Sequence, residues 1–172
     1  MGGMIAQEFA LSYPEKTRSL VLAVTDCGGR EAVPAKPEVL LVSQGRANST
    51  PSDAFWAMSK FIYDPATPRE RLAEDLAARE NENTLTAPAN YMRQLQAITT
   101  WQGTHDRLAN LKVPTLVLHG KNDQRIPCAN AQILAAAIPN AELVELDHAS
   151  HIFMTDQPEK SAAAILEFLA DK

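Results

Sequence analysis

The sequence predicts an α/β fold with a parallel sheet of about three strands, helices on both faces of the sheet, and a helical insertion. Three short runs rich in Val and Leu, at residues 19–25, 115–119 and 142–146, have the composition of strands. Apolar residues with helical spacing precede and follow these runs. Between the first two runs, residues 30–105 contain no convincing strand.

Length, charge and composition exclude several classes of protein. The chain has 172 residues, which suits one ordinary domain, and a net charge of −5 without a run of like charge, so we expect no nucleic-acid partner. No uninterrupted apolar stretch, residues 20–24 included, approaches the roughly 18 residues that cross a bilayer. We therefore expect no membrane association. Two cysteines are too few for a disulfide scaffold, which favours a reducing, cytoplasmic location. No cofactor is expected.

Residues 1–29 form the first predicted core segment, a helix followed by a strand. Ala6, Phe9, Ala10 and Tyr13 fall at i, i+3, i+4 and i+7, which predicts a helix over residues 3–13 with these four side chains on its buried face. Pro14 ends the helix. The run SLVLAVT at residues 19–25 is apolar throughout its middle, as in a strand that is buried on both faces.

Residues 30–105 form a predicted helical cap, or lid. Six prolines between residues 34 and 88 divide it into short helical stretches, and it holds most of the aromatic residues of the chain. These aromatic side chains suggest an apolar substrate, but contacts that simply hold the helices together also explain them in full.

Residues 106–172 form the second predicted core segment, a βαβα unit whose two strands should be parallel. Its strands are residues 115–119 and 142–146, with a helix at 129–138 between them. A last helix opens at Asp156 and Pro158. The predicted buried face of the helix at 129–138 consists of Ala131, Leu134, Ala135 and Ile138. That of the last helix consists of Ala162, Ile165, Leu166 and Leu169. The charges of Glu142 and Glu145 suit an edge strand, whereas residues 19–25 should have a neighbour on each side and the chain supplies at most one.

The loops that follow the strands carry the candidate catalytic residues, because ligands of parallel α/β sheets bind beyond the carboxyl ends of the strands. Asp26, Asp123 and His151 lie in these loops. A carboxylate that accepts the imidazole Nδ1 proton leaves Nε2 free to take a proton from a nucleophile, so Asp123 and His151 are a candidate catalytic pair. A surface Asp and a structural loop His are the alternative interpretation.

Two further interpretations of the same loops remain open. His148 lies three residues before His151 and is a rival base. His119, Asp123, His148 and His151 together suggest a metal site, although their spacing does not match standard zinc motifs, and we expect no metal.

Three motifs, in the right order, resemble the α/β-hydrolase superfamily. Residues 1–11, MGGMIAQEFAL, resemble the second half of the nucleophile elbow and the helix after it. VPTLVLHG at residues 113–120, with Asp123 and Pro127, is similar to the seventh strand and the acid loop of the family. Ala149, Ser150 and His151 resemble the small-residue-then-His signature after the eighth strand. The resemblance implies a truncated α/β-hydrolase sheet, equivalent to the sixth to eighth strands, and makes the helical insertion its cap.

The resemblance also implies roles for individual residues. Asp123 would be the triad acid, with Asp26 as the alternative acid after the sixth strand, and His151 would be the base. The backbone N–H of Met1 would belong to the oxyanion hole. The nucleophilic Ser would stand immediately before Met1 and is therefore expected to be absent from this chain. Ser12, Ser150 and Cys27 are poor substitutes, because neither their positions nor their neighbours suggest contact with His151.

The implied parent activity is hydrolysis of a carboxylic ester, lactone or related small apolar acyl substrate by a Ser-His-Asp mechanism. The stretch GGMIAQ is most similar to 3-oxoadipate enol-lactonases and cofactor-free haloperoxidases. Without the nucleophile, we expect this chain to be inactive alone. The alternative function is a non-catalytic fragment or interaction module. Its exposed strand edge would pair with a second copy in a homodimer, or with a missing N-terminal half.

Overall fold

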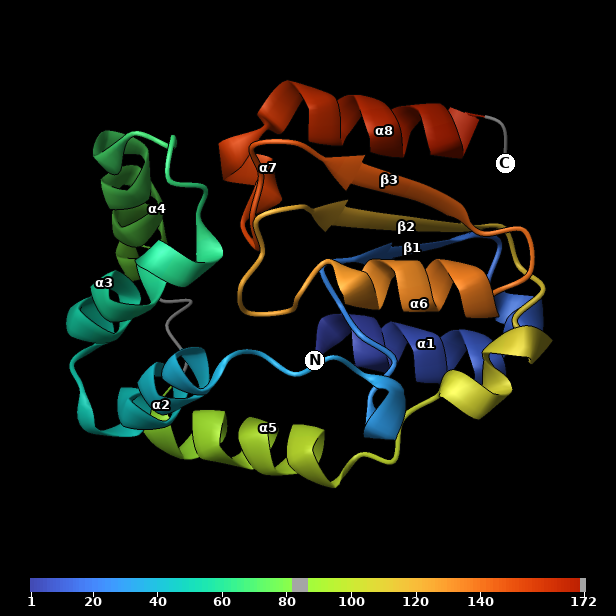
Figure 1. Ribbon diagram of the computed structural model, residues 1–172, viewed down its shortest axis with the longest axis horizontal. Helices are drawn as coiled ribbons and strands as arrows, with labels where there is room; N and C mark the ends of the chain where they lie inside the picture. Colours follow the sequence, from blue (N-terminus) through green and yellow to red (C-terminus); the bar gives the residue numbers. More distant parts are fainter. Residues whose placement is uncertain (82–86, 171–172) are drawn as a thin grey trace.

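A three-stranded parallel sheet lies at the centre of the computed structural model, which describes residues 1–81 and 87–170. The strands are β1 (Leu20–Ala23), β2 (Thr115–Gly120) and β3 (Glu142–Leu146), in the order β1-β2-β3 (Figure 1). In the register, Leu22 pairs with Val117, and Leu118 pairs with Val144. The three predicted strands are confirmed. β1 is shorter than residues 19–25 because Val24, with a φ of 44°, leaves the extended conformation.

Helices cover both faces of the sheet, as predicted. The helices α1 (Gly2–Ser12) and α6 (Ala129–Ala137) lie against one face, and α8 (Pro158–Ala170) lies against the other (Figure 1). A short 3-10 helix, η1 (Pro14–Lys16), links α1 to β1. Most of the predicted face of α6 is confirmed, because Ala131, Leu134 and Ile138 are buried.

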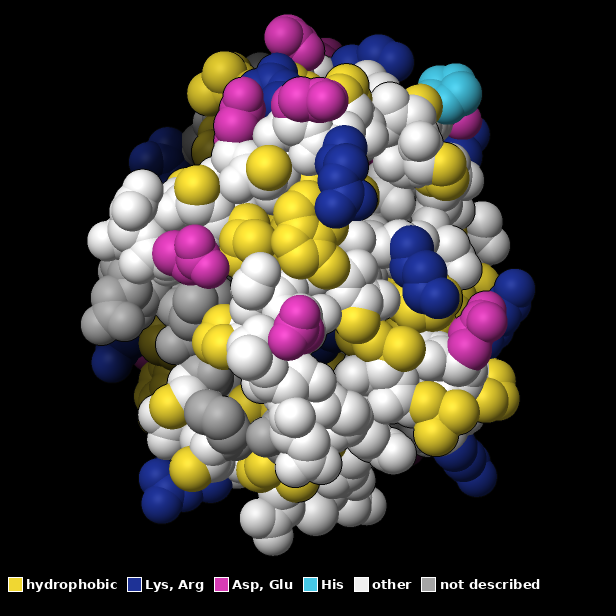
Figure 2. Space-filling view, turned by 90° about the vertical axis from the view of Figure 1, so that its left-hand side faces the viewer, with side chains coloured by type: hydrophobic (Ala, Val, Ile, Leu, Met, Phe, Trp, Pro, Cys, Tyr) yellow, Lys and Arg dark blue, Asp and Glu magenta, His cyan; other side chains and the backbone are white. Residues whose placement is uncertain are grey.

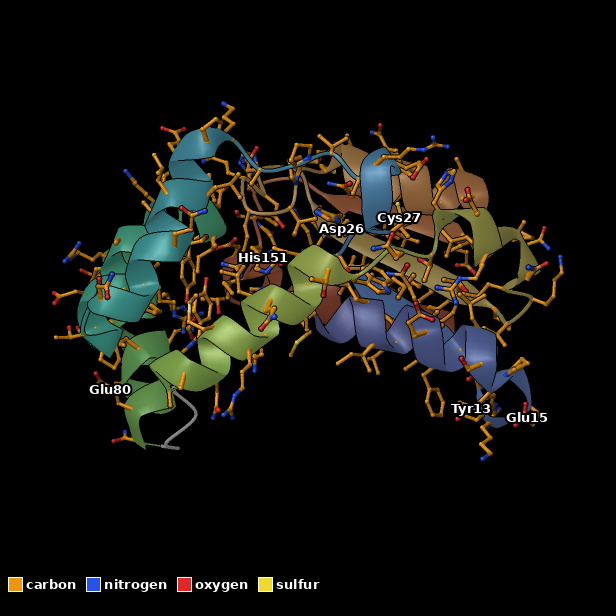
Figure 3. All side chains as sticks on the ribbon, turned by 90° about the horizontal axis from the view of Figure 1, so that it is seen from below. Tyr13, Glu15, Asp26, Cys27, Glu80 and His151 are labelled. Atoms are coloured by element: carbon orange, nitrogen blue, oxygen red, sulfur yellow. The ribbon has the colours of Figure 1, made fainter. Side chains whose placement is uncertain are left out.

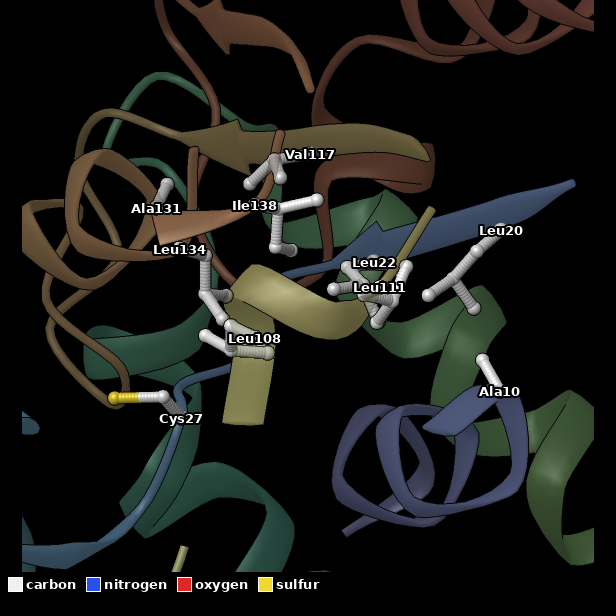
Figure 4. Packing of buried hydrophobic residues seen from close by; sticks show 10 residues of the cluster. All are labelled: Ala10, Leu20, Leu22, Cys27, Leu108, Leu111, Val117, Ala131, Leu134 and Ile138. Carbon is white, nitrogen blue, oxygen red and sulfur yellow. The ribbon is translucent and has the colours of Figure 1, made fainter. Parts of the chain in front are cut away.

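The main core fills the space between the sheet and the helices α1 and α6. Leu22, Leu108, Val117 and Leu134 are fully buried there, together with Cys27 (Figure 4). Burial of each such leucine or valine contributes about 1.5–3 kcal/mol to folding. A second cluster around Leu116, Leu118, Phe153 and Phe168 packs on the opposite face, under α8. These two clusters fix the position of the strand ends.

The predicted buried face of α1 is wrong for two of its four residues. Phe9 and Tyr13 are each 47% exposed, whereas Gln7 and Ala10 are buried. Gln7 can face the core because its amide donates to the carbonyl of Asp26 (2.9 Å) and accepts from the hydroxyl of Thr104. Small residues complete this face: a Cβ on Gly3 would collide with the side chain of Thr25.

The predicted face of α8 is wrong for three of its four residues, Ala162, Leu166 and Leu169, whereas Ile165 packs toward the sheet as predicted. Leu166 and Leu169 are exposed at 67% and 45%, and the face toward β3 is built from Ser161, Ala164, Ile165 and Phe168. Ser161 is tolerated in the interior because its hydroxyl donates to the carbonyl of Pro158 (3.0 Å). A separate turn, α7 (Phe153–Asp156), precedes α8 and was not predicted.

The cap consists of helices, and its described part, residues 30–81 and 87–105, contains no strand. Its helices are α2 (Pro37–Gly45), α3 (Pro51–Ile62), α4 (Arg69–Asn81) and α5 (Pro88–Thr100), with the short 3-10 helices η2 (Gly29–Glu31) and η3 (Arg46–Asn48); η4 (His105–Asn110) follows them. Proline begins α2, α3 and α5, at the position where its missing N–H costs nothing. Val39, Phe55, Phe61 and Leu76 are buried in the cap's own cluster.

The face of the molecule over the cap carries charges of both signs. Lys and Arg side chains alternate there with Asp and Glu side chains and with separate apolar patches (Figure 2). No helix within residues 1–81 and 87–170 is both long and apolar enough to span a membrane. The exact domain boundaries, 1–29, 30–105 and 106–172, stay a prediction.

Candidate active site

The loops after the three strands meet between the sheet and the cap. All three strands point their carboxyl ends toward the cap, and the N-terminus of α1 lies at the same end (Figure 1). His151 lies between the cap helices and the sheet, and Asp26 and Cys27 follow it on the sheet side (Figure 3). The parallel topology therefore gathers the predicted residues at one end of the sheet.

Asp123 and His151 are hydrogen-bonded to each other. The distance from His151 Nδ1 to Asp123 Oδ2 is 2.8 Å, and the Asp123 side chain is fully buried. The other carboxylate oxygen, Oδ1, accepts the backbone N–H groups of Arg125 (2.8 Å) and Ile126 (2.9 Å). Because an ionised carboxylate only accepts hydrogen bonds, Nδ1 of His151 carries the hydrogen, and Nε2 is left to accept a proton.

His119 is a second imidazole at the same carboxylate. Its Nε2 donates to the carbonyl of Ile126 (2.8 Å) and lies 3.4 Å from Asp123 Oδ2. Burial by itself would raise the pKa of Asp123, but the hydrogen bonds from His119 and His151 outweigh it and hold this pKa below its usual value. Asp123 therefore stays ionised next to His151.

The acid loop and the histidine loop approach each other closely at Gly120. A Cβ at this position would overlap the backbone of Ala149 and Ser150, so only glycine allows the two loops to come this near. The Asn122 N–H also donates to the Ala149 carbonyl (2.9 Å). This contact sets the separation between Asp123 and His151.

Asp156 fixes the histidine loop to the start of the cap. Its Oδ2 accepts the N–H groups of Ser150 (2.7 Å) and Asp64 (3.1 Å), and its Oδ1 accepts the hydroxyl of Thr67 (2.6 Å). Asp64 in turn accepts the side-chain amide of Asn122 (2.6 Å). Burial raises the pKa of Asp156. The sequence predicts for Asp156 only the opening of the last helix, because nothing in the local pattern points to partners about 90 residues away.

A cavity of about 400 Å³ adjoins the Asp123–His151 pair. His151 and the N-terminus of α1, including Met1, line it, and apolar side chains from the cap complete it, among them Val39, Leu40, Leu95 and Ile98. Burial lowers the pKa of the Met1 α-amino group. The cavity thus brings an imidazole, a helix N-terminus and an apolar wall together.

Asp26, the alternative acid, lies in the same cavity but bonds elsewhere. Its carboxylate accepts the N–H of Gly28 (2.8 Å), and within the described chain it forms no hydrogen bond to His151. His148, the rival base, is exposed, and its carbonyl accepts the amide of Gln157.

The alternative nucleophiles do not meet the imidazole. The Ser150 hydroxyl donates to the carbonyl of Asn122 (3.2 Å), and Ser12 lies outside the cavity that His151 lines. Burial raises the pKa of Cys27 to about 11, and burial raises that of Cys128 to about 12 with help from Glu145. Both thiols are therefore protonated near neutral pH.

Three residues of the alternative metal site meet, because His119 and His151 both lie at the Asp123 carboxylate, but His148 is exposed. Within residues 1–81 and 87–170, the only group of three possible ligands close enough for one ion is Glu31, His105 and Asp106, which includes none of the four predicted residues. Asp106 is exposed, and the Glu31 carboxylate already accepts a hydrogen bond from Arg30 Nε (2.7 Å). This group carries no further conclusion.

Comparisons with known proteins agree with the fold and the sequence motifs. The Hydrolase_4 family, described as serine aminopeptidase S33, matches residues 1–158. The chain is 36% identical over 170 residues to a poly(3-hydroxyalkanoate) depolymerase of Ectopseudomonas oleovorans, covering 98% of the chain and 58% of the depolymerase. It is 29% identical over 175 residues to a 2-hydroxy-6-oxononadienedioate/2-hydroxy-6-oxononatrienedioate hydrolase of Burkholderia vietnamiensis, covering 98% and 59%.

A solved structure shows the same fold. The enol-lactonase from Burkholderia xenovorans LB400 superposes with a TM-score of 0.80 at 24% identity, covering 99% of this chain and 63% of the lactonase. The chain thus spans about three fifths of the length of these relatives. The predicted resemblance is confirmed, and the chain belongs to the Hydrolase_4 family of α/β-hydrolases.

Proposed function

We propose that this chain supplies the acid, the base and the cap of a serine hydrolase that cleaves a carboxylic ester, a lactone or a related small acyl substrate. The hydrogen bond of 2.8 Å between His151 Nδ1 and Asp123 Oδ2, beside the cavity of about 400 Å³, carries the proposal. The names of the relatives, a depolymerase and a hydrolase, support the same reaction class.

In the proposed mechanism, a serine hydroxyl attacks the acyl carbon and gives its proton to His151 Nε2. The carbonyl oxygen becomes an oxyanion, which backbone N–H groups at the start of α1 would stabilise, including that of Met1. His151 then passes the proton to the leaving alkoxide, and water hydrolyses the acyl-enzyme in the same way. Asp123 keeps the imidazole oriented and stabilises its positive charge.

The nucleophile is proposed to be a serine directly before Met1 in a longer form of the protein. Two observations support this assignment. Met1 and His151 line one cavity, and no described hydroxyl or thiol is hydrogen-bonded to His151 Nε2. The chain as printed is therefore expected to hydrolyse no ester, and a chain extended through that serine is expected to be active.

The test compares the two chains with a fluorophosphonate probe and p-nitrophenyl esters. The extended chain should be labelled at the added serine, and His151→Asn should lower its kcat/KM by a factor on the order of 10⁴. The matched control is His148→Asn, because His148 is exposed, has a φ of 55° that asparagine tolerates, and should leave activity unchanged. Labelling of the printed chain at Ser12, Ser150 or Cys27 would contradict the proposal.

A second candidate function, a non-catalytic interaction module, is favoured by the edge of β1. Leu20 and Val24 donate their N–H groups to Pro114 and Leu118 (both 2.9 Å), so the alternating N–H groups of Val21 and Ala23 point away from β2. In the described chain no strand covers that side. A second copy, or an N-terminal half, would pair there. Fast hydrogen exchange at Val21 and Ala23 in concentrated solution would count against this candidate.

A further inference from the structure

A smaller cavity of about 220 Å³ lies on the cap side of His151 and contains three arginines. Arg46, Arg79 and Arg125 line it together with apolar side chains that include Phe55, Met58 and Ile62. No Asp or Glu of the described residues lines it. The charge of the lining is therefore positive, in a chain whose net charge is −5.

The three arginines come from separate elements. Arg46 begins η3, Arg79 lies near the end of α4, and Arg125 follows Asp123 by two residues in the acid loop. Burial lowers the pKa of Arg46, and the charges of Arg125 and Arg79 act in the same direction. The charges of Arg46 and Arg125 repel each other, and an anion bound between them would offset this repulsion.

The side chains of Arg46 and Arg125 form no ion pair with any described residue. Arginines elsewhere do form such pairs: Arg30 with Glu31, Arg71 with Glu74, and Arg107 with Glu8. Arg46 instead lies over the ring of Tyr91, with 4.9 Å between its guanidinium carbon and the ring centroid, and the Tyr91 hydroxyl donates to the carbonyl of Ser43 (2.9 Å). This cation–π contact holds the guanidinium beside the ring, and within the described residues the guanidinium forms no ion pair that would compete with a ligand.

His151 and Arg125 line both this cavity and the larger apolar one. A ligand with its reacting carbonyl at His151 can therefore reach into both cavities. The larger cavity suits a hydrocarbon segment, and the smaller one offers planar guanidinium groups, which bind a carboxylate through paired hydrogen bonds. Both signs of charge are interspersed on the outer face of the cap (Figure 2), so the positive charge is local to the cavity and does not suit an extended polyanion.

We propose that Arg46, Arg79 and Arg125 form a carboxylate-binding subsite, so that the substrate is an ester or lactone that also carries a free carboxylate group. This proposal rests on the proposed function for the position of the reacting bond. It narrows the substrate class from apolar acyl compounds in general to anionic ones.

The test measures binding of two ligands that have no bond to hydrolyse. Levulinate, a keto acid, and methyl propyl ketone, its neutral analogue of equal carbon count, are titrated into the protein and followed by NMR shifts of the cap and His151. Levulinate should bind about tenfold more tightly or better. Arg46→Gln and Arg125→Gln should each remove most of that advantage, whereas Arg93→Gln, on the exposed face of α5, should not.

The outcomes separate the subsite from the hydrolase activity. If levulinate binds with the expected arginine dependence but the extended chain hydrolyses no ester, the subsite stands and the proposed function fails. If neutral esters are hydrolysed but the two ligands bind equally, the subsite is overturned and the hydrolase stands. Equal affinity for inorganic phosphate and levulinate also overturns the subsite. So does a loss of levulinate affinity in Arg93→Gln as large as that in Arg46→Gln and Arg125→Gln. Circular dichroism of each variant checks that it is folded.

Discussion

Asp123 has donor groups close to both of its carboxylate oxygens. Two backbone N–H groups, those of Arg125 and Ile126, hold Oδ1, and two imidazoles, those of His119 and His151, face Oδ2. A buried carboxylate with this many donors remains ionised, which is the state that fixes the tautomer of His151. Two consequences can be measured without any catalytic activity.

The first consequence concerns the tautomer of His151. In Asp123→Asn the amide oxygen can keep the two backbone N–H groups, and the amide NH₂ then faces His151. We expect the neutral ring to move its hydrogen from Nδ1 to Nε2, so that Nδ1 accepts. Imidazole ¹⁵N shifts distinguish the two tautomers, with His148 as the internal reference. An unchanged His151 tautomer in the variant would show that Asp123 does not control the ring.

The second consequence is the dependence of stability on pH. The pKa of Asp123 is lower in the folded chain, so its contribution to the free energy of unfolding is present above the unfolded value of about 3.9 and is lost as pH falls through the folded pKa. The stability difference between the original chain and Asp123→Asn should shrink as the pH falls below about 4. Asp156 titrates in both chains, so it cancels in this difference. Urea unfolding over a pH series measures this difference, and a difference that stays the same below pH 4 would contradict the prediction.

At the scale of elements, Asp156 connects α7, the histidine loop and the segment that enters the cap. Asp156→Ala leaves the N–H groups of Ser150 and Asp64 without acceptors, which should lower the free energy of unfolding by about 2 kcal/mol or more. In Asp156→Asn, the amide oxygen can still accept both N–H groups, and the amide nitrogen can donate to the hydroxyl of Thr67. The free energy of unfolding should therefore fall by less than about 1 kcal/mol. Urea unfolding of both variants tests this. Equal losses would mean that the charge of Asp156, and not its acceptor positions, holds the loop.

The elements that the sequence predicted correctly are those whose neighbours are set by topology. β2, β3 and α6 follow from apolar patterns, and Asp123 and His151 meet because they leave adjacent parallel strands. The faces of α1 and α8 could not be predicted in this way. Gln7 is buried because a partner 97 residues away, Thr104, satisfies it, and a local pattern contains no trace of that contact. The arginine subsite and Asp156 escaped prediction for the same reason, since their partners come from distant segments.

At the scale of the whole molecule, the exposed face of α1 and the open edge of β1 form one surface. Ile5 and Phe9, exposed at 59% and 47%, line a hollow that continues to Leu20, at the start of β1. Phe9 also lines an adjoining apolar groove of about 450 Å³, together with Tyr13 and with Trp101 of the cap. A continuous apolar surface beside unpaired strand N–H groups favours association.

We therefore expect the chain to self-associate as its concentration rises, through the face of α1 beside the edge of β1. Phe9→Lys places a charge on that face and should shift sedimentation toward the monomer. Leu166→Lys is the matched control, because Leu166 is 67% exposed on α8, over the opposite face of the sheet, and its substitution should change association little. Lysine at either position costs little folding free energy, since both side chains already contact water. A monomer at every concentration, or equal effects of the two variants, would show that this surface does not recruit a second copy.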